Sequence, residues 1–124
     1  MWEQFTINEM TQAMNLDALT TSHPIQVPIK HAEEVMQVFD TISYRKGACV
    51  VRMIHSVLGD VHFRDGLRLY FKRHSYGNTV TADLWQAWQD VSGKDIPALM
   101  STWTEKMGYP IVRCTEKSST PDRC

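Results

Sequence analysis

Signals for β-strands are nearly missing from this chain of 124 residues. Its one alternating apolar stretch, IQVPI at 25–29, follows Pro24 and contains Pro28. Proline is disfavoured inside a sheet because it donates no ladder hydrogen bond. We therefore expect residues 20–30 to form an extended connector and the rest of the chain to be helical.

Long apolar runs and an excess of charge of one sign are also missing. No run approaches the roughly 18 apolar residues that a membrane-spanning helix needs, so we predict no membrane segment. Basic and acidic residues number 13 and 14, which gives a formal net charge of −1. Without a broad basic field, nucleic acid is a poor candidate for a partner.

Cysteine is scarce, and Cys49, Cys114 and Cys124 are the complete set. An odd count without CxxC spacing argues against a disulfide framework and against a zinc knuckle. Cys114 and Cys124 would pair only under oxidising conditions. Cysteine usage therefore favours a reducing compartment, and we expect a cytoplasmic protein.

The chain carries none of the short motifs that mark common active sites. Its five histidines form no HExxH and no i, i+4 pair, so we predict no metal ligands in this chain. It contains no GxSxG nucleophile elbow, and its six glycines form neither a P-loop nor a dinucleotide fingerprint. Cys49 lies among apolar residues, which raise the pKa of a thiol, so we do not expect a catalytic cysteine there.

What the chain has in abundance is apolar residues at helical spacing. Hydrophobic residues make up 43% of the sequence. We expect a helix over each of the segments 2–19, 31–39, 44–58, 61–75, 81–91 and 96–107. These segments predict an all-α bundle of five or six helices with short loops over residues 1–112. Residues 113–124 are polar, and we expect a disordered tail there.

Capping residues predict where these helices begin and end. Gly59 is expected to end the helix at 44–58, and Asp60 is a suitable cap for the next one. Thr81 and Asp95 are the expected caps of the last two helices. The residues expected to share buried faces on the last three helices are Phe63, Leu67, Tyr70, Phe71 and His74; Leu84, Trp85, Trp88 and Val91; and Ile96, Leu99, Met100, Trp103 and Met107.

A tyrosine stands where the most apolar helix begins, in the stretch FDTISYRKGA at 39–48. That helix has only Arg52, His55 and Ser56 as polar interior residues, so it has to be covered on most sides. Its start then lies where several elements meet, and a phenol there would be held at the rim of a cleft. The residues alone favour the structural interpretation, in which Tyr44 anchors packing through one hydrogen bond.

Five segments, in order along residues 2–112, resemble the M1 family of zinc aminopeptidases, nearest to its puromycin-sensitive branch. They are ALTTSHPIQVP at 18–28, FDTISYRKGACVVRM at 39–53, GDVHFRDGLRLYFKRHSYGN at 59–78, TADLWQA at 81–87, and SGKDIPALMSTWTEKMGYPIV at 92–112.

The resemblance implies the later, helical part of a thermolysin-like catalytic domain. The family's HExxHxxxxxxE zinc motif and GxMEN amine-binding motif are not in this sequence. Zinc in the complete enzyme would therefore be held by the remainder of the catalytic domain, which becomes the expected partner of this chain. No zinc ligand is expected in the chain itself.

The resemblance also implies a role for two residues, from their positions within the matching segments. Tyr44 resembles the tyrosine whose hydroxyl donates a hydrogen bond to the oxyanion of the transition state. Phe39 resembles an aromatic residue that lines the pocket for the substrate's first side chain. The resemblance leaves open whether Arg45 and Lys46 act on the reaction, and we expect both at the solvent rim.

Two interpretations follow. The first is a fragment of a zinc aminopeptidase, whose substrates are peptides with a free N-terminus, and which is inactive on its own. The alternative is a truncated helical module for binding or regulation. Such a module would associate with itself or with a full-length relative through an exposed apolar face.

Overall fold

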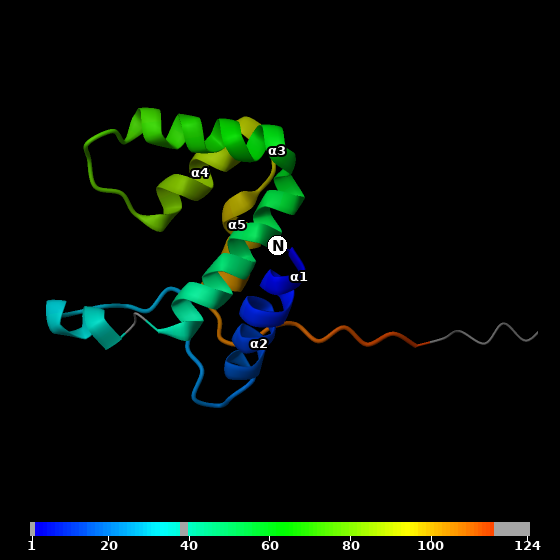
Figure 1. The fold of residues 1–124 in the computed structure, drawn as a ribbon. Coiled ribbons are helices and arrows are strands. Elements are labelled where there is room, and N and C mark those ends of the chain that lie inside the picture. The colour runs from blue at the N-terminus through cyan, green and yellow to red at the C-terminus, as the bar shows by residue number, and fades with distance from the viewer. Residues whose placement is uncertain (1, 38–39, 116–124) are drawn as a thin grey trace, which may run out of the picture.

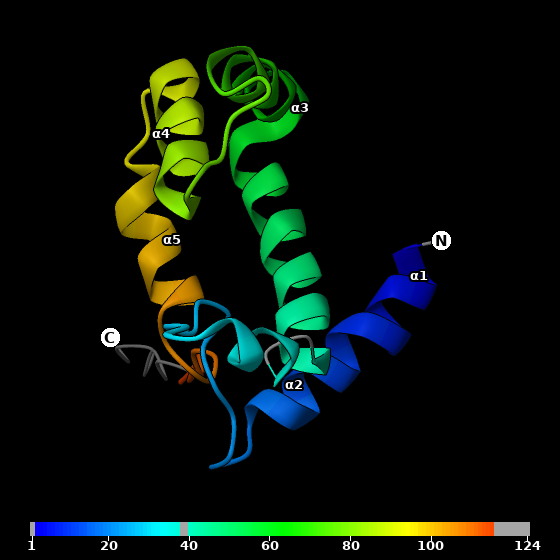
Figure 2. The same cartoon turned by 90° about the vertical axis from the view of Figure 1, so that its left-hand side faces the viewer.

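A computed structural model describes residues 2–37 and 40–115, with the side chains of residues 32 and 37 left aside. Every regular element within these residues is a helix, which confirms the all-α prediction. Figures 1 and 2 show two groups of helices, one at each end of the long helix α3. None of the helices described is long and apolar enough to cross a bilayer.

The first helical segment is continuous from Trp2 to Asp17, two residues shorter than predicted. It consists of α1 (Trp2–Gln4), a π-helical stretch η1 (Phe5–Met10) and α2 (Thr11–Asp17). Only Ala13 and Asp17 are buried in it. The buried acid at its end is the first sign of an internal charge pair.

The expected connector follows and leads into a short 3-10 helix, η2 (Ala32–Gln37). The Gln26 amide donates a hydrogen bond of 2.8 Å to the carbonyl of Thr104. The Thr104 hydroxyl donates in turn to Gln26 Oε1 at 3.2 Å. These two bonds hold the connector against the end of the last helix.

The apolar helix consists of a π-helical start, η3 (Ile42–Lys46), and α3 (Gly47–Arg73). Gly59 has φ 75° and ψ 166°, so it interrupts the helical geometry of α3. Figure 1 shows the two halves of α3 meeting at a sharp bend, which confirms the predicted helix end. The carboxylate of Asp60 lies 3.0 Å from His55 Nε2 across this bend.

Two shorter helices pack beside α3: α4 (Thr81–Ser92) and α5 (Ile96–Thr104). Asp95 caps α5 as predicted, and accepts a hydrogen bond from the amide of Ala98 at 3.1 Å. Thr81 is wrong as a cap because it is already the first helical residue. The Asp83 carboxylate instead accepts a bond of 2.9 Å from the Val80 amide.

The core lies where α3, α4 and α5 meet. Its fully buried side chains are Ile54, Trp88, Ile96 and Met100. Two predicted core residues are exposed. Phe71 faces solvent near the far end of α3, and Met107 lies beyond α5, which ends at Thr104. Residues 110–115 leave the helices as an extended segment (Figure 1), and the predicted disorder of the tail stays a prediction.

Candidate functional site

Tyr44 lies on the wall of an open groove. Its side chain is 62% exposed. The groove has a volume of about 860 Å³ and runs between the connector and the start of the apolar helix. Its lining residues are Pro24, Ile25, Gln26, Val27, Pro28, Ile29, Ser43, Tyr44, Thr81 and Glu105.

Asp40 sets the backbone that carries Tyr44. Its Oδ1 accepts a hydrogen bond of 2.9 Å from the amide of Ser43, and its carbonyl accepts one of 3.2 Å from the amide of Tyr44. An aspartate side chain that accepts a hydrogen bond from the backbone amide three residues later is a common cap at the start of a helix. The turn that follows is π-helical, a local widening that recurs at functional sites.

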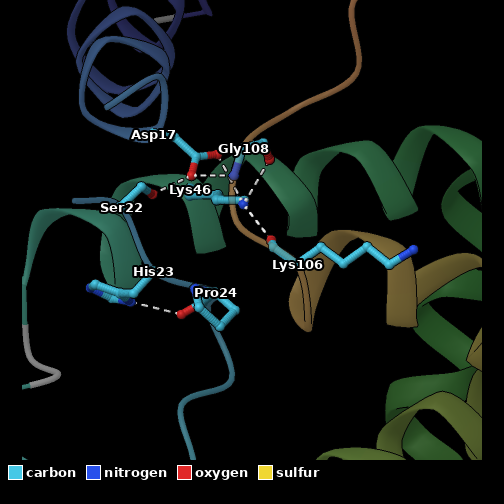
Figure 3. A network of polar contacts seen from close by, with 7 residues as sticks. All are labelled: Asp17, Ser22, His23, Pro24, Lys46, Lys106 and Gly108. Atoms are coloured by element: carbon cyan, nitrogen blue, oxygen red, sulfur yellow. Dashed lines mark hydrogen bonds and ion pairs between the residues drawn. The ribbon is translucent and has the colours of Figure 1, made fainter. Parts of the chain in front are cut away.

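Lys46, two residues after Tyr44, is buried and anchors this turn from the opposite side. Its Nζ lies 2.9 Å from Asp17 Oδ2, and both side chains are less than a tenth exposed. The same ammonium donates to the carbonyls of Lys106 at 3.1 Å and Gly108 at 3.0 Å (Figure 3). The expectation of a rim position for Lys46 is therefore wrong.

Asp17 is as fully bonded as its partner. Its Oδ1 accepts from Ser22 Oγ at 2.6 Å and from the amide of Gly108 at 2.8 Å. Burial acts to raise the pKa of this carboxyl, but the hydrogen bonds from Ser22, Lys46 and Gly108 outweigh it and lower the pKa below its usual range. The Asp17 carboxyl is therefore ionised at neutral pH, and its contacts with Lys46 and Gly108 tie α2, η3 and the segment after α5 together.

Arg45 is also held, although it is only half-buried. Its Nη1 donates to the carbonyl of Asn8 at 2.8 Å and lies 3.7 Å from the carboxylate of Glu9. The side chains of the two residues after Tyr44 thus contact the first helical segment, while Tyr44 itself lines the groove.

His23 bridges the two walls of this groove. Its Nδ1 lies 2.8 Å from the carbonyl of Pro24, and its Nε2 lies 2.6 Å from Asp40 Oδ2. Both neighbours are oxygen acceptors, so the protonated ring, which has a hydrogen on each nitrogen, can donate to both of them. The hydrogen bond to Asp40 raises the pKa of His23 above its usual value, and the carbonyl of Pro24 adds to this effect.

Sequence reasoning singled out Tyr44 but missed Asp17, His23, Asp40 and Lys46. The only available signal was that three of the four stand inside the segments SHPI and FDTISYRKG. Phe39 lies outside the described residues. Cys49 behaves as expected, since burial raises the pKa of its thiol. Among residues 2–37 and 40–115, no group of three or more His, Cys, Asp and Glu side chains is arranged to hold a metal ion.

Known proteins match most of this chain. A family model described as the peptidase family M1 domain matches residues 1–103. This chain belongs to peptidase family M1. The M1 chain is 46% identical over 116 residues to "Aminopeptidase 2, mitochondrial" of Saccharomyces cerevisiae. It is 44% identical over 116 residues to "Alanine/arginine aminopeptidase" of the same yeast, and 48% identical over 112 residues to "Aminopeptidase M1" of Arabidopsis thaliana.

These matches cover 90–94% of the M1 chain but only 12–14% of the length of the three relatives. The chain is therefore equivalent to one segment of a much longer protein.

Proposed function

We propose that this chain is the helical part of the catalytic domain of an aminopeptidase that removes N-terminal residues from peptides. Peptides with a free N-terminus are the substrates, and the remainder of the catalytic domain is the partner. The proposal rests on family membership and on relatives that are named aminopeptidases.

Within that enzyme, Tyr44 donates a hydrogen bond from its hydroxyl to the oxyanion that develops on the scissile carbonyl. A neutral donor already in position stabilises charge that exists only in the transition state, so it raises the catalytic constant rather than substrate affinity. Phe39 is proposed to line the pocket for the first side chain of the substrate.

One observation carries the role of Tyr44 more than any other. Its ring is exposed to a groove while the residue two positions later is locked into a buried ion pair. A turn held from behind presents its outward side chain in one direction, which is what a preorganised donor requires.

Tyr44→Phe in the complete enzyme tests this role. We expect a catalytic constant lower by about 10²–10³-fold with little change in KM, the usual scale for losing one oxyanion donor. The free energy of unfolding should change by less than about 0.5 kcal/mol, as for other exposed positions. A catalytic constant within about threefold of wild type would make Tyr44 a structural residue.

In that enzyme, a zinc ion would polarise the scissile carbonyl and activate the attacking water. The described residues of this chain provide no set of ligands for it, so we assign the metal to residues outside this chain. A cytoplasmic location stays a prediction from cysteine usage.

A helical module for binding or regulation is the second candidate, and exposed apolar side chains favour it. Trp2 is 57% and Ile7 is 67% exposed on the first helical segment. Exposed apolar surface of this kind favours association with a second copy or with a full-length relative. Size-exclusion chromatography discriminates, because a clean monomer at high concentration counts against this candidate.

A further inference from the structure

The two walls of the groove are separate pieces of chain that meet through one charged contact. One wall is the connector, and the other is the start of the apolar helix with Ser43 and Tyr44. His23 stands at the beginning of the first wall and Asp40 at the beginning of the second, 2.6 Å apart. The middle of the connector wall is held by the bond from Gln26 to Thr104.

We propose that His23 is a positioning residue for Tyr44: through its contact with Asp40, the imidazolium holds the connector against the helix start and fixes the direction of the phenol over the groove. This inference rests on the function proposed for Tyr44. His23 itself lines no part of the groove and acts through Asp40.

With His23 protonated, each bond in this chain of contacts has one direction. His23 donates to Asp40 and to the carbonyl of Pro24, so it fixes both the helix start and the first residue of the connector wall. The two oxygens of the Asp40 carboxylate are shared between His23 and the amide of Ser43. Loss of the proton leaves the imidazole with a single N–H, so it can no longer donate to both Asp40 and the carbonyl of Pro24, and the connector is held less firmly at this end.

The charged groups around His23 all favour its proton. Asp40 faces it from the start of η3, and Asp17 from the end of α2 adds to the attraction. The ammonium of Lys46 is itself paired with Asp17 and bonded to two carbonyls. Figure 3 shows His23 and Pro24 beside this cluster but outside it.

The sign of the pH dependence follows from the two pKa directions. The pKa of His23 is raised in the folded chain, so the stabilisation that its charge gives to the contact is fully present below about pH 6.5 and is lost as the pH rises through the raised value. Burial acts to raise the pKa of Asp40, but hydrogen bonds from Ser43 and His23 lower it overall. On the acid side the contact is therefore lost only below the usual range of an aspartate.

An NMR titration of the isotope-labelled 124-residue chain tests the contact without reference to catalysis. We expect the His23 ring nitrogens to titrate above pH 6.5, and the amides of Ser43 and Tyr44 to shift with the same midpoint. Asp40→Asn should move the His23 midpoint down to the ordinary range and abolish the shared midpoint. A His23 that titrates at or below about 6.5 in the wild type, or amides that do not follow it, would overturn the proposal.

The chain offers a matched control for this titration. His55 and Asp60 form a second histidine–aspartate contact at 3.0 Å, on the bend of α3 and away from the groove. Asp60→Asn should leave unchanged the pH midpoint at which the amide signals of Ser43 and Tyr44 shift. If Asp40→Asn does not fold, His23→Gln replaces it. The side-chain amide of glutamine donates a hydrogen bond at every pH. The chemical shift of the Tyr44 backbone amide should therefore keep its low-pH value throughout the titration, and a shift that changes with pH would overturn the proposal.

Kinetics of the complete enzyme separate this inference from the role of Tyr44. We expect His23→Ala to lower the catalytic constant by roughly tenfold with little change in KM, because a misplaced donor loses part of its effect. His23→Gln should recover part of that loss and remove the alkaline fall of the catalytic constant that we expect in wild type. An unchanged alkaline fall in His23→Gln would overturn the proposal. If Tyr44→Phe alone leaves the catalytic constant unaffected, the proposed function fails while the NMR coupling stands.

Discussion

At the scale of single residues, the most informative contrast is between Tyr44 and Lys46. They are two positions apart in one helical turn, so their side chains point to different sides. The tyrosine is exposed and the lysine is buried, although burial tendencies alone would assign them the other way round. A lysine is buried only when its charge is paired, and the partner here is 29 positions earlier, at Asp17.

Replacing Lys46 tests this pair. Lys46→Met approximately keeps the volume of the side chain and removes its ammonium group. The Asp17 carboxylate is then left buried without the cation that pairs with it. We expect the free energy of unfolding at pH 7 to fall by about 3–5 kcal/mol, measured by urea denaturation. Arg45→Met, which removes a half-buried cation from the neighbouring position, is the matched control and should cost about 1 kcal/mol or less.

The pH dependence of the same variant has a defined sign. In wild type the pKa of Asp17 is lowered, so its contribution is present above the usual aspartate range and is lost as the pH falls through the lowered value. In Lys46→Met, protonation of the buried Asp17 carboxyl removes an unpaired charge and so stabilises the variant. The difference in the free energy of unfolding between wild type and variant should therefore shrink between about pH 7 and pH 4. A deficit that grows on acidification would show that the ion pair is not the source of the loss.

At the scale of elements, one glycine decides how closely α3 and α4 approach. Trp88 is 1% exposed and its indole stacks with the rings of Phe63 and Trp85, at centroid distances of 5.1 and 5.5 Å. Its Nε1 donates to the carbonyl of Phe63 at 3.0 Å. A Cβ added at Gly66 would lie 2.2 Å from Trp88 Cδ1, so only glycine fits there.

A pair of glycine substitutions measures this contact. Gly66→Ala forces the indole out of a position fixed on several sides, and we expect a loss of about 1–3 kcal/mol in the free energy of unfolding. Gly47→Ala has the same chemistry at a helical φ of −55° with no atom within 4 Å of the added Cβ. It should be neutral or stabilising by up to about 1 kcal/mol. Thermal melts that rank the two variants in the opposite order would contradict the close approach.

The elements themselves were largely predictable because their signals are local. Asp95 with Pro97, and the glycines at positions 59 and 93, act on the few residues around them. The errors arise where a local signal competes with a neighbour. Thr81 is a good cap by type, but Asp83 already satisfies the amide of Val80 and helix formation begins at the threonine.

At the scale of the whole molecule, the chain is a small part of what its relatives contain. It spans 12% of the yeast "Aminopeptidase 2, mitochondrial" and includes no described metal-binding group. The groove beside Tyr44 is open, so one side of any substrate site has to be completed by other residues. A catalytic donor without the rest of its site has no reaction to accelerate.

We therefore expect no hydrolysis of aminoacyl-coumarin substrates by this chain with added zinc. Fluorescence release should match a buffer blank at enzyme concentrations where a complete relative gives rapid turnover. Turnover that co-purifies with the chain and stops on addition of a chelator would contradict the expectation. The Tyr44→Phe variant is the control, because activity from a contaminating peptidase would persist in it.

The sequence by itself determined the helical elements, the bend at Gly59, the family and the place of Tyr44 at a helix start, because propensity, capping and motif spacing depend on residues close together in the chain. The tertiary structure alone decided which charges are buried and which side chains meet across the groove. Those contacts join residues as far apart as Asp17 and Gly108, separated by 91 positions, or His23 and Asp40, separated by 17. Their pairing depends on how the helices pack, and no local pattern encodes the distance between two such atoms.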